Sequence, residues 1–249
     1  MRSIFSAKVA DYTASRPDYS QALFDTLRTR CALGSGAVVA DVGAGTGLLT
    51  RDLLKQGYRV TAVEPNPAMR AASDLLLGEL EGYFSADGCA EALPLESASV
   101  DLITAAQAFH WFEIERARKE CLRVLAPSGK VALIWNDRVL EDPLHLALNE
   151  IFSEFGGAKR AALLAHEDRA ETPKFFGSTD PEEFSWPHQH FLDKAGLLSL
   201  VFSRSYIPER DTPDGHAVAH RVRQVFGRLQ QNGIVAIRYQ TVVILGRPG

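Results

Sequence analysis

The sequence has few cysteines, and they form no pattern. The three present, Cys31, Cys89 and Cys121, lie far apart, and no two of them make a Cys-x-x-Cys pair. Disulfide-stabilised domains and cysteine-based zinc sites need cysteines at characteristic spacings. The odd, scattered set therefore argues against both kinds of structure and is typical of a protein of the reducing cytosol.

A basic excess and long hydrophobic runs are missing as well. The 27 lysines and arginines stand against 31 aspartates and glutamates, which gives a net charge of −4. A nucleic-acid-binding domain normally shows a basic excess or stripe, so we expect no nucleic-acid partner. The uncharged run at 102–112 is far shorter than a membrane span, and Lys8 and Asp11 make the first residues a poor signal peptide. We expect a cytoplasmic protein with no membrane partner.

What is present is a regular alternation of short apolar runs and helical patterns. Each apolar run followed by a helix and another run predicts a right-handed crossover, and a series of them predicts a parallel sheet covered on both faces. The pattern predicts strands at 37–42, 58–63, 82–86, 100–105 and 130–135, with helices at 46–56, 66–77 and 113–125.

Outside this region the rhythm changes. A helix is expected at 18–31, and helical patches at 144–155 and 158–168 are followed by a segment interrupted by prolines and glycine. Strands at 198–207 and 234–245 then flank a helix at 213–231, and the sequence leaves their relative direction open.

The fold class expected from these patterns is α/β, a Rossmann-like, doubly wound and mostly parallel sheet of seven strands. We divide the chain into four segments: an N-terminal helical lid at 1–36, a nucleoside-binding core at 37–137, a helical cap insertion at 138–197, and strands and a helix that complete the sheet at 198–249.

A glycine-rich loop follows the first predicted strand. Asp41 ends the strand, Gly43, Gly45 and Gly47 follow, and a helix comes next. Glycines allow a sharp turn and close contact between a ligand and the backbone, and the helix N-terminus offers free N–H groups. The second strand ends in Glu64, where a doubly wound fold presents a carboxylate to ribose hydroxyls. Together these features predict a nucleoside site.

The spacing of the glycines indicates which nucleoside. Dehydrogenases use G-x-G-x-x-G to approach a pyrophosphate, whereas this loop reads G-x-G-x-G with Asp41 two residues before it. A carboxylate there would repel a pyrophosphate but suits an ammonium group. The loop therefore favours S-adenosylmethionine, which carries an ammonium group, over a dinucleotide.

At this point the sequence resembles the class I S-adenosylmethionine-dependent methyltransferases of the type 11 family. The stretches that carry the resemblance are VADVGAGTG (39–47), VTAVEPNPAM (60–69), GCAEALPLESASVDLITAAQAFHWF (88–112) and RVLAPSGKVALIWN (123–136). The phrases AQAFHWF, YTASRPDYS and SRSYIP are similar to the branch of trans-aconitate methyltransferase-like enzymes, which act on small molecules.

The resemblance implies a set of cofactor contacts. The three glycines would line the cofactor, Glu64 would bind the ribose, and Gln107 would border the methionine part. The family often has an acidic residue where this chain has Cys89, so backbone groups near Cys89 and Ala90 are expected there instead. The cofactor-binding residues implied are Tyr12, Arg16, Tyr19, Asp41, Gly43, Gly45, Gly47, Glu64, Pro65, Asn66, Cys89, Ala90 and Gln107.

The resemblance also implies which residues lie near the adenine and near the methionine carboxylate. Pro65 or Asn66 would flank the adenine. Tyr12, Arg16 and Tyr19 would come from the N-terminal lid, with Arg16 paired to the methionine carboxylate; without the resemblance, these three residues read as ordinary packing of the first helix.

His110 and Trp111 follow the fourth predicted strand, at the carboxyl edge where α/β folds place ligands. His110 could bind a substrate carboxylate or act as a general base, and Trp111 could contact the substrate. The alternative is a packed aromatic corner. His188 with His190, and His216 with His220, could each present two imidazoles, but no third ligand is patterned beside either pair, so no metal is expected.

The function expected from the sequence is methyl transfer from S-adenosylmethionine to a small molecule, a carboxylic acid being one candidate, by direct in-line displacement that leaves S-adenosylhomocysteine. Three alternatives stay open: a protein that binds the cofactor without catalysis, a nucleotide-dependent oxidoreductase on the same architecture, and a macromolecular acceptor such as a protein carboxyl group.

Overall fold

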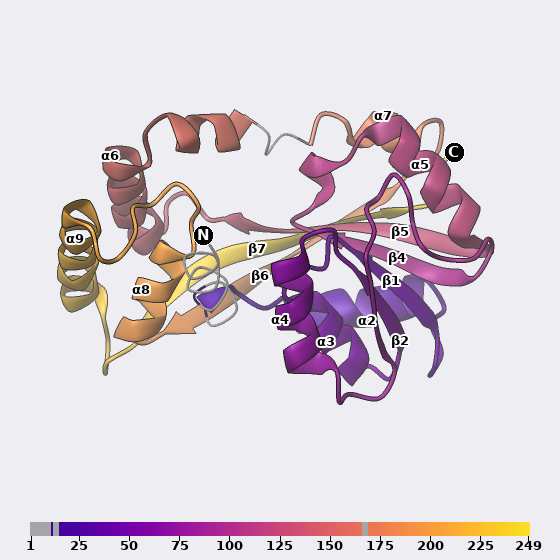
Figure 1. Cartoon of the computed structure of the whole chain (residues 1–249), viewed down its shortest axis with the longest axis horizontal. Coiled ribbons are helices and arrows are strands. Elements are labelled where there is room, and N and C mark those ends of the chain that lie inside the picture. Colours follow the sequence, from indigo (N-terminus) through magenta and orange to yellow (C-terminus); the bar gives the residue numbers. More distant parts are fainter. Residues whose placement is uncertain (1–10, 12–14, 166–168) are drawn as a thin grey trace. The chain divides into compact units, whose positions relative to one another are not determined.

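The structure, a computed structural model, describes residue 11 and residues 15–165 and 169–249. Its strands form one sheet in the order β3-β2-β1-β4-β5-β7-β6 (Figure 1). They are β1 (Val38–Val42), β2 (Arg59–Val63), β3 (Tyr83–Ala86), β4 (Val100–Ala106), β5 (Leu125–Arg138), β6 (Glu182–Leu192) and β7 (Val235–Gly246). The α/β class and the seven-stranded, mostly parallel sheet expected from the sequence are confirmed.

Strand β1 lies at the point where the strand order reverses. It pairs in parallel with β2 on one side and β4 on the other, and the parallel pairing continues to β3 and to β5. The connections run through α3 (Leu48–Lys55), α4 (Pro67–Leu77) and α5 (Ile114–Val124). In open α/β sheets such a switch point leaves a crevice at the carboxyl ends of the strands, where ligands bind.

By their internal contacts, the residues fall into two compact units. The sheet unit comprises 19–136, 168–186 and 241–249, and the helical unit comprises 1–18, 137–167 and 187–240. Each unit has an apolar core of its own.

The sheet unit is covered on both faces. Neighbouring side chains of one strand enter different clusters: Leu102 packs with α2 (Gln21–Arg30) and α3, while Ile103 packs with α5 and α7 (Thr172–Phe176). This alternation is what a β-strand requires when both faces are buried, since successive side chains point to opposite sides.

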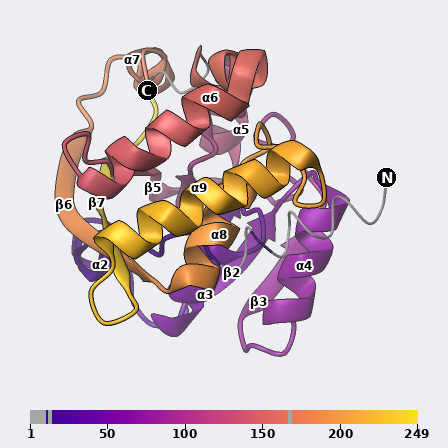
Figure 2. The ribbon, with the colours of Figure 1, turned by 90° about the vertical axis from the view of Figure 1, so that its left-hand side faces the viewer.

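The helical unit contains α6 (Pro143–Ala165), α8 (Lys194–Phe202) and α9 (Pro213–Leu229). Helices α6 and α9 lie side by side (Figure 2), and their apolar faces bury Leu148, Val218 and Val222. Helix α6 breaks at Gly157, whose φ of 51° and ψ of −147° are not helical, in the gap between the two helical patches predicted there. Among the described residues, no helix is long and apolar enough to cross a membrane.

Three local predictions were wrong. Residues 194–202 form α8, although a strand was expected at 198–207; an apolar run this short does not distinguish helix from strand, and Asp193 caps the helix through the N–H of Gly196 (2.7 Å). Within the expected helical cap, β6 is a strand with alternating exposure. The sequence Pro127-Ser128-Gly129 predicts a turn, but these residues lie inside β5, where the register with β4 shifts.

The two units also divide the chain differently from the four expected segments. Helix α2, expected in the lid, belongs to the sheet unit because Leu23, Phe24 and Leu27 are buried in its core. Residues 168–186 leave the expected cap for the sheet unit, since Phe175 and Phe176 pack beneath α5. Of the expected C-terminal segment, only 241–249 belongs to the sheet unit.

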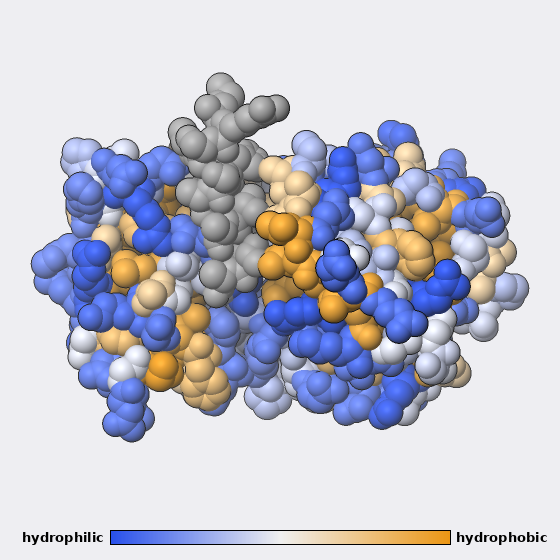
Figure 3. Space-filling view, turned by 60° about the horizontal axis from the view of Figure 1, so that its bottom comes forward, coloured by the Kyte–Doolittle hydropathy of each residue, from blue (hydrophilic) through white to orange (hydrophobic). Residues whose placement is uncertain are grey.

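The surface is mostly hydrophilic, and Figure 3 shows apolar residues gathered in separate patches on one face. Within the sheet unit, the segment from α4 to β3 exposes four large apolar side chains, Leu75, Leu76, Leu80 and Phe84. The guanidinium of Arg59 lies over the Phe84 ring, 5.5 Å from its centroid, and so covers part of this apolar surface.

His145 is a buried titratable group of the helical unit. Its Nε2 lies 2.8 Å from the Arg238 carbonyl oxygen, and its ring meets the edge of the Tyr239 ring. Burial lowers the pKa of His145 to about 4. Between that pKa and its ordinary value the unfolded chain binds more protons than the folded one, so the contribution of His145 to stability is present above pH 6.5 and is lost as pH falls toward 4.

We therefore expect acid to destabilise the protein through His145. Between pH 7 and pH 5 the wild type should lose about 1.5–2 kcal/mol more in its free energy of unfolding than His145→Gln, which keeps an N–H donor but does not titrate. Urea unfolding at the two pH values measures this difference. His220→Gln, at an exposed position of α9, is the control and should keep the wild-type pH dependence. Equal pH dependence in the wild type and His145→Gln would contradict the assignment.

Candidate functional site

The glycine loop joins β1 to α3 at the carboxyl edge of the sheet. Gly43, Gly45 and Gly47 all have positive φ angles, of 72°, 59° and 81°. The N–H groups of Gly43 and Ala44 both donate to the carbonyl of Val63, at 2.8 and 3.2 Å. The loop is therefore fastened to the end of β2.

The three glycines differ in what surrounds them. A Cβ at Gly43 would lie 2.6 Å from the Cβ of Ala108, and one at Gly47 would lie 2.5 Å from atoms of Leu77 and Ser73. At Gly45 a Cβ would meet nothing within 4 Å. Packing thus explains the first and third glycines, while the middle one leaves open space above the backbone, as a ligand in contact with the loop would need.

Glu64 fixes the middle of the loop. Its carboxylate is 8% exposed, and Oε2 accepts the N–H of Gly45 while Oε1 accepts the N–H of Asn66, both at 2.9 Å. A carboxylate has about four lone-pair sites, so two backbone bonds leave acceptor capacity for hydroxyl groups. The residue predicted to bind ribose therefore lies directly beside the open space at Gly45.

The two residues predicted to flank adenine follow Glu64. The Asn66 side-chain oxygen accepts the N–H groups of Ala68 and Met69, at 3.0 and 3.2 Å, and so caps α4. The side-chain oxygen of Asn66 is therefore used in capping the helix. Pro65, the residue before it, provides an apolar side chain at this turn.

Asp41 lies beneath the loop. It is 1% exposed, and its two oxygens accept the hydroxyl protons of Thr50 (2.7 Å) and Thr104 (2.8 Å). Burial raises the pKa of Asp41 to about 6, despite these bonds. The structure therefore gives Asp41 a role that the sequence did not indicate: it joins β1, β4 and α3 under the loop.

Gln107 occupies a strained position at the end of β4. Its φ is 56°, in the left-handed region that side chains other than glycine seldom adopt, and its N–H donates to the carbonyl of Ile134 (2.9 Å). The next residue, Ala108, is the one that abuts Gly43. The end of β4 is thus brought against the glycine loop, with the exposed Gln107 side chain beside it.

His110 and Trp111 lie on a short 3₁₀ helix, η1 (Phe109–Trp111). Phe109 is buried, with ring edges meeting Phe175 and Trp135 at centroid distances of 5.4 and 6.3 Å. An aromatic corner is therefore present, and Phe109 forms it together with Phe112, whose ring lies 5.8 Å from that of Phe109, centroid to centroid. Trp111 is 65% exposed, and the His110 ring lies 4.8 Å from it.

The segment Cys89-Ala90-Glu91 is held in place by its glutamate. Oε1 of Glu91 accepts the N–H of Glu113 (2.7 Å) at the start of α5, and Cys89 forms a single β-bridge with Ala92. Ala90 is 3% exposed. The acidic residue next to Ala90 is therefore used inside the fold.

The residues expected from the lid do not fall in one unit. Tyr12 lies outside the described residues. Tyr19 is 9% exposed and packs in the core of the sheet unit, whereas Arg16 belongs to the helical unit. Tyr19 therefore contributes to core packing, which was the alternative interpretation of these positions.

Each of the two histidines of β6 has a hydrogen-bond partner within the helical unit. His188 Nε2 lies 2.9 Å from Asp18, and His190 Nε2 lies 3.0 Å from the carbonyl of Ser15. The bond from His188 lowers the pKa of Asp18, and burial lowers the pKa of His190. Within the described part of the chain, no three or more His, Cys, Asp or Glu side chains are grouped to hold a metal ion.

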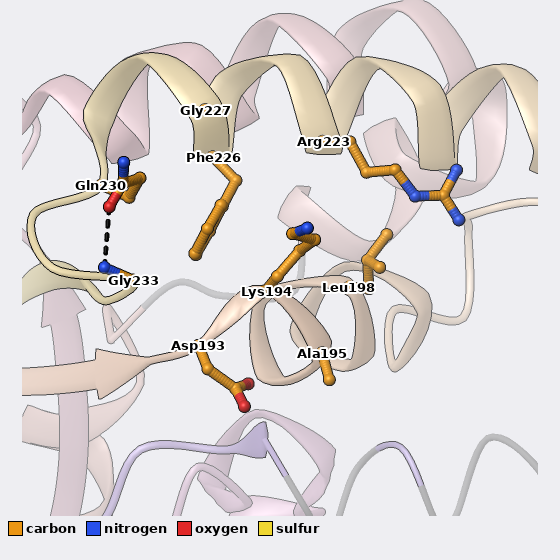
Figure 4. Close-up of a pocket in the computed structure, with 9 residues that line it drawn as sticks. All are labelled: Asp193, Lys194, Ala195, Leu198, Arg223, Phe226, Gly227, Gln230 and Gly233. Carbon is orange, nitrogen blue, oxygen red and sulfur yellow. Dashed lines mark hydrogen bonds between the residues drawn. The ribbon is translucent and has the colours of Figure 1, made fainter.

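Sequence reasoning missed a hollow of about 850 Å³ between α8 and α9. Figure 4 shows the Phe226 side chain descending from α9 into the space between Gly233 and Lys194, with the bond from the Gly233 N–H to Gln230 (2.7 Å) at one end. The residues that line it are Asp193, Lys194, Ala195, Leu198, Arg223, Phe226, Gly227, Gln230 and Gly233. None of them belongs to the predicted site.

Arg169 was missed as well. Its guanidinium lies over the ring of Trp135, 4.2 Å from the centroid, near the end of β5. Nothing in the local sequence distinguishes Arg169, because the contact joins positions 34 residues apart (169 − 135).

The sequence is similar to those of known proteins. A family model described as a methyltransferase domain matches residues 40–133. The chain is similar to an uncharacterised methyltransferase of Mycobacterium tuberculosis, with 33% identity over 243 residues that cover 96% of this chain and 93% of the relative.

Solved structures give the same picture of the fold. A protein of Anaeromyxobacter dehalogenans assigned as a type II methyltransferase superposes with a TM-score of 0.63 at 21% identity, covering 93% of this chain and 97% of the other. The geranyl diphosphate C-methyltransferase of Streptomyces coelicolor, solved with S-adenosyl-L-homocysteine, gives a TM-score of 0.50 at 14% identity, covering 91% and 77%.

The surroundings of the glycines predict unequal costs of substitution. Gly45→Ala should lower the free energy of unfolding by about 1–2 kcal/mol, the cost of a side chain at positive φ. Gly43→Ala should cost about 3–4 kcal/mol, because the collision with Ala108 adds to the same strain. Urea unfolding of the two variants measures the difference. A cost at Gly45 equal to or above that at Gly43 would mean that the space above the loop is not open.

Proposed function

The chain belongs to the class I methyltransferase family, and on that premise we propose that it binds S-adenosylmethionine and transfers the methyl group to a small molecule, with a carboxylic acid as the acceptor class considered first. We also propose that it acts in the cytoplasm. The net charge of −4 supports a small acceptor over a nucleic acid.

The arrangement of Gly45 and Glu64 carries this proposal. The Gly45 N–H is bonded to Glu64 at 2.9 Å, and the Cβ side of Gly45 is open. An adenosine placed there would give its ribose hydroxyls to the remaining lone pairs of Glu64 and lie against a backbone without a side chain. The S-adenosylhomocysteine in the Streptomyces enzyme supports the choice of cofactor, since that protein shares the fold.

The other residues have distinct tasks in this proposal. When bound, S-adenosylmethionine supplies an activated methyl group that an acceptor takes by in-line displacement. Gln107, at the end of β4, would hold the methionine part beside Gly43. The protein must align the acceptor and exclude water, and a large part of the rate enhancement then comes from positioning.

The need for a base depends on the acceptor. A carboxylic acid is ionised at pH 7 and needs none, whereas a hydroxyl acceptor would transfer its proton to His110, which lies on η1 just beyond Gln107. The glycine loop, Glu64, Gln107 and His110 all belong to the sheet unit, so the proposed cofactor site and the proposed base lie within one unit.

Cofactor binding can be tested by thermal melting. At 100 times its dissociation constant, S-adenosylmethionine should stabilise the protein by about 2.7 kcal/mol, a shift on the order of 5–10 °C for this size. Gly45→Val should lose the shift, because the branched side chain would fill the open space. Gly36→Val is the matched control, since Gly36 also has positive φ and open surroundings, and its shift should remain.

Other ligands separate the alternatives. S-adenosylhomocysteine should shift the melting temperature as well, and NAD should not, because the loop lacks the spacing used for a pyrophosphate. A shift with NAD alone would overturn the proposal in favour of an oxidoreductase. A shift with S-adenosylmethionine but no methyl transfer to any acceptor would indicate a binding protein.

His110→Ala tests whether the imidazole takes part in the reaction. With a hydroxyl acceptor kcat should fall on the order of 10²-fold, the usual contribution of a general base, with the melting shift from S-adenosylmethionine retained. With a carboxylate acceptor kcat should change by less than about tenfold, since no proton is removed. The rate of S-adenosylhomocysteine formation measures kcat with each acceptor. Unchanged turnover with every acceptor would remove His110 from the mechanism.

A further inference from the structure

Arg70 lies on α4, one turn after the cap formed by Asn66, and its side chain reaches back to the end of β2. Its backbone N–H donates to the Asn66 carbonyl (2.9 Å), which fixes its position in the helix. Its Nη1 donates to the carbonyl oxygen of Glu64 at 2.5 Å and also lies 3.2 Å from Oδ1 of Asp87. A hydrogen bond from a charged donor is stronger than one between neutral groups, so Arg70 holds the Glu64 backbone firmly.

The peptide group between Glu64 and Pro65 depends on this bond. Proline carries no N–H, so the carbonyl of Glu64 is the one polar group through which a hydrogen bond can fix this peptide. Arg70 is bound to that carbonyl. The turn after β2 is therefore fixed from α4 by Arg70, at a point where the proline offers no second attachment.

Arg70 also connects the ends of β2 and β3. The parallel register of these strands ends with Val63 opposite Ala86, and the N–H of Glu64 donates to the Ala86 carbonyl at 3.1 Å. Asp87, the ion-pair partner of Arg70, is the next residue after Ala86. The backbone of Glu64 is thus held at its N–H by the neighbouring strand and at its carbonyl by Arg70.

The orientation of the Glu64 carboxylate follows from these bonds. Its two oxygens accept the N–H groups of Gly45 and Asn66, both at 2.9 Å. With backbone and side chain both fixed, the remaining lone pairs of the carboxylate point in one direction before a ligand arrives. Such preorganisation raises affinity for a ligand whose hydroxyls match that direction.

A surface ion pair is the alternative role for Arg70. The Asp87 side chain is 73% exposed, and exposed ion pairs contribute little to stability. The Arg70 side chain is only 20% exposed, because its guanidinium turns inward to the Glu64 carbonyl. The contact with Glu64 is therefore the one in which a change at Arg70 should be felt.

We propose that Arg70 is a positioning residue of the cofactor site, which orients the Glu64 carboxylate toward the ribose hydroxyls and so makes the site select a ribonucleoside over one without hydroxyls; this inference rests on the proposed function. The effect of Arg70 passes through Glu64 and not through a contact of its own with the cofactor.

The test measures by calorimetry, on the full chain, the affinity for S-adenosylhomocysteine and for its 2′,3′-dideoxy analogue. Arg70→Gln should weaken S-adenosylhomocysteine binding about tenfold or more, as expected when a charged hydrogen bond is disturbed. Binding of the dideoxy analogue should weaken by less than about threefold, because the coupled partner of Glu64 is missing. Arg70→Lys keeps the charge and a donor, and should recover part of the lost affinity.

Two further variants are matched controls. Asp87→Asn removes the ion pair but leaves the bond to Glu64, so both affinities should stay near the wild-type values. Arg28→Gln removes an exposed arginine that is paired with Asp25 on α2 of the same unit, and should likewise change neither affinity.

The inference is overturned if Arg70→Gln binds S-adenosylhomocysteine as well as the wild type does, or if its affinity falls by the same factor for both ligands, which is what a general structural role predicts. If Arg70→Gln does not fold, Arg70→Lys decides by the same comparison. A wild type that does not bind S-adenosylhomocysteine, or a Glu64→Gln variant that binds it unchanged, contradicts the proposed function instead, so the two failures are distinguishable.

Discussion

The carboxylate of Glu64 links the two turns on which the site depends. Through one oxygen it holds the loop after β1 at Gly45, and through the other it holds the turn after β2 at Asn66, both at 2.9 Å. Because the parallel register of β1 and β2 ends at Val42 and Val63, these turns lie side by side, and one acidic residue can reach both. If Glu64 were replaced by an apolar residue, two backbone N–H groups would lose their partners at a partly buried position, at a cost of about 1–3 kcal/mol each. The residue proposed to recognise ribose is therefore also a structural element of the site.

Asp41 completes this arrangement from below. Its pKa of about 6, against an ordinary 3.8, corresponds to destabilisation of the ionised form by roughly 3 kcal/mol. The hydroxyls of Thr50 and Thr104 offset part of the desolvation, and in return the carboxylate joins β1, β4 and α3. Held by Glu64 on one side and supported by Asp41 on the other, the loop keeps its glycines at positive φ before any ligand arrives. A site of this kind needs little reorganisation on binding, which is one way in which a protein raises affinity.

The parts of the fold and site that could be predicted from the sequence are those that depend on residues close together in the chain. Three features can each be recognised from residues a few positions away in the sequence: the apolar run before the loop, the glycines, and Glu64 at the end of β2. The structure brings these features together. Helix α8 was mistaken for a strand because its residues are almost all apolar, so no periodicity distinguishes the two. The different roles of Gly43 and Gly45 depend on Ala108, which is more than sixty positions along the chain, and no local pattern reports that contact. For the same reason Arg169 was missed: its orientation comes from Trp135, a residue of another element.

Gln107 shows how strain and function meet at this edge of the sheet. A left-handed backbone costs a residue with a side chain roughly 1–2 kcal/mol, and glycine would avoid that cost. Among the described residues, the side-chain amide makes a long contact, 3.5 Å from the carbonyl of Asn136, so this part of the fold gains little from it. The strained backbone does, however, turn the chain so that Ala108 packs on Gly43, Phe109 enters the core and His110 follows at the surface of the same edge. The proposed role of Gln107, to hold the methionine part of the cofactor beside Gly43, gives a reason for a glutamine at a position where glycine would avoid this cost.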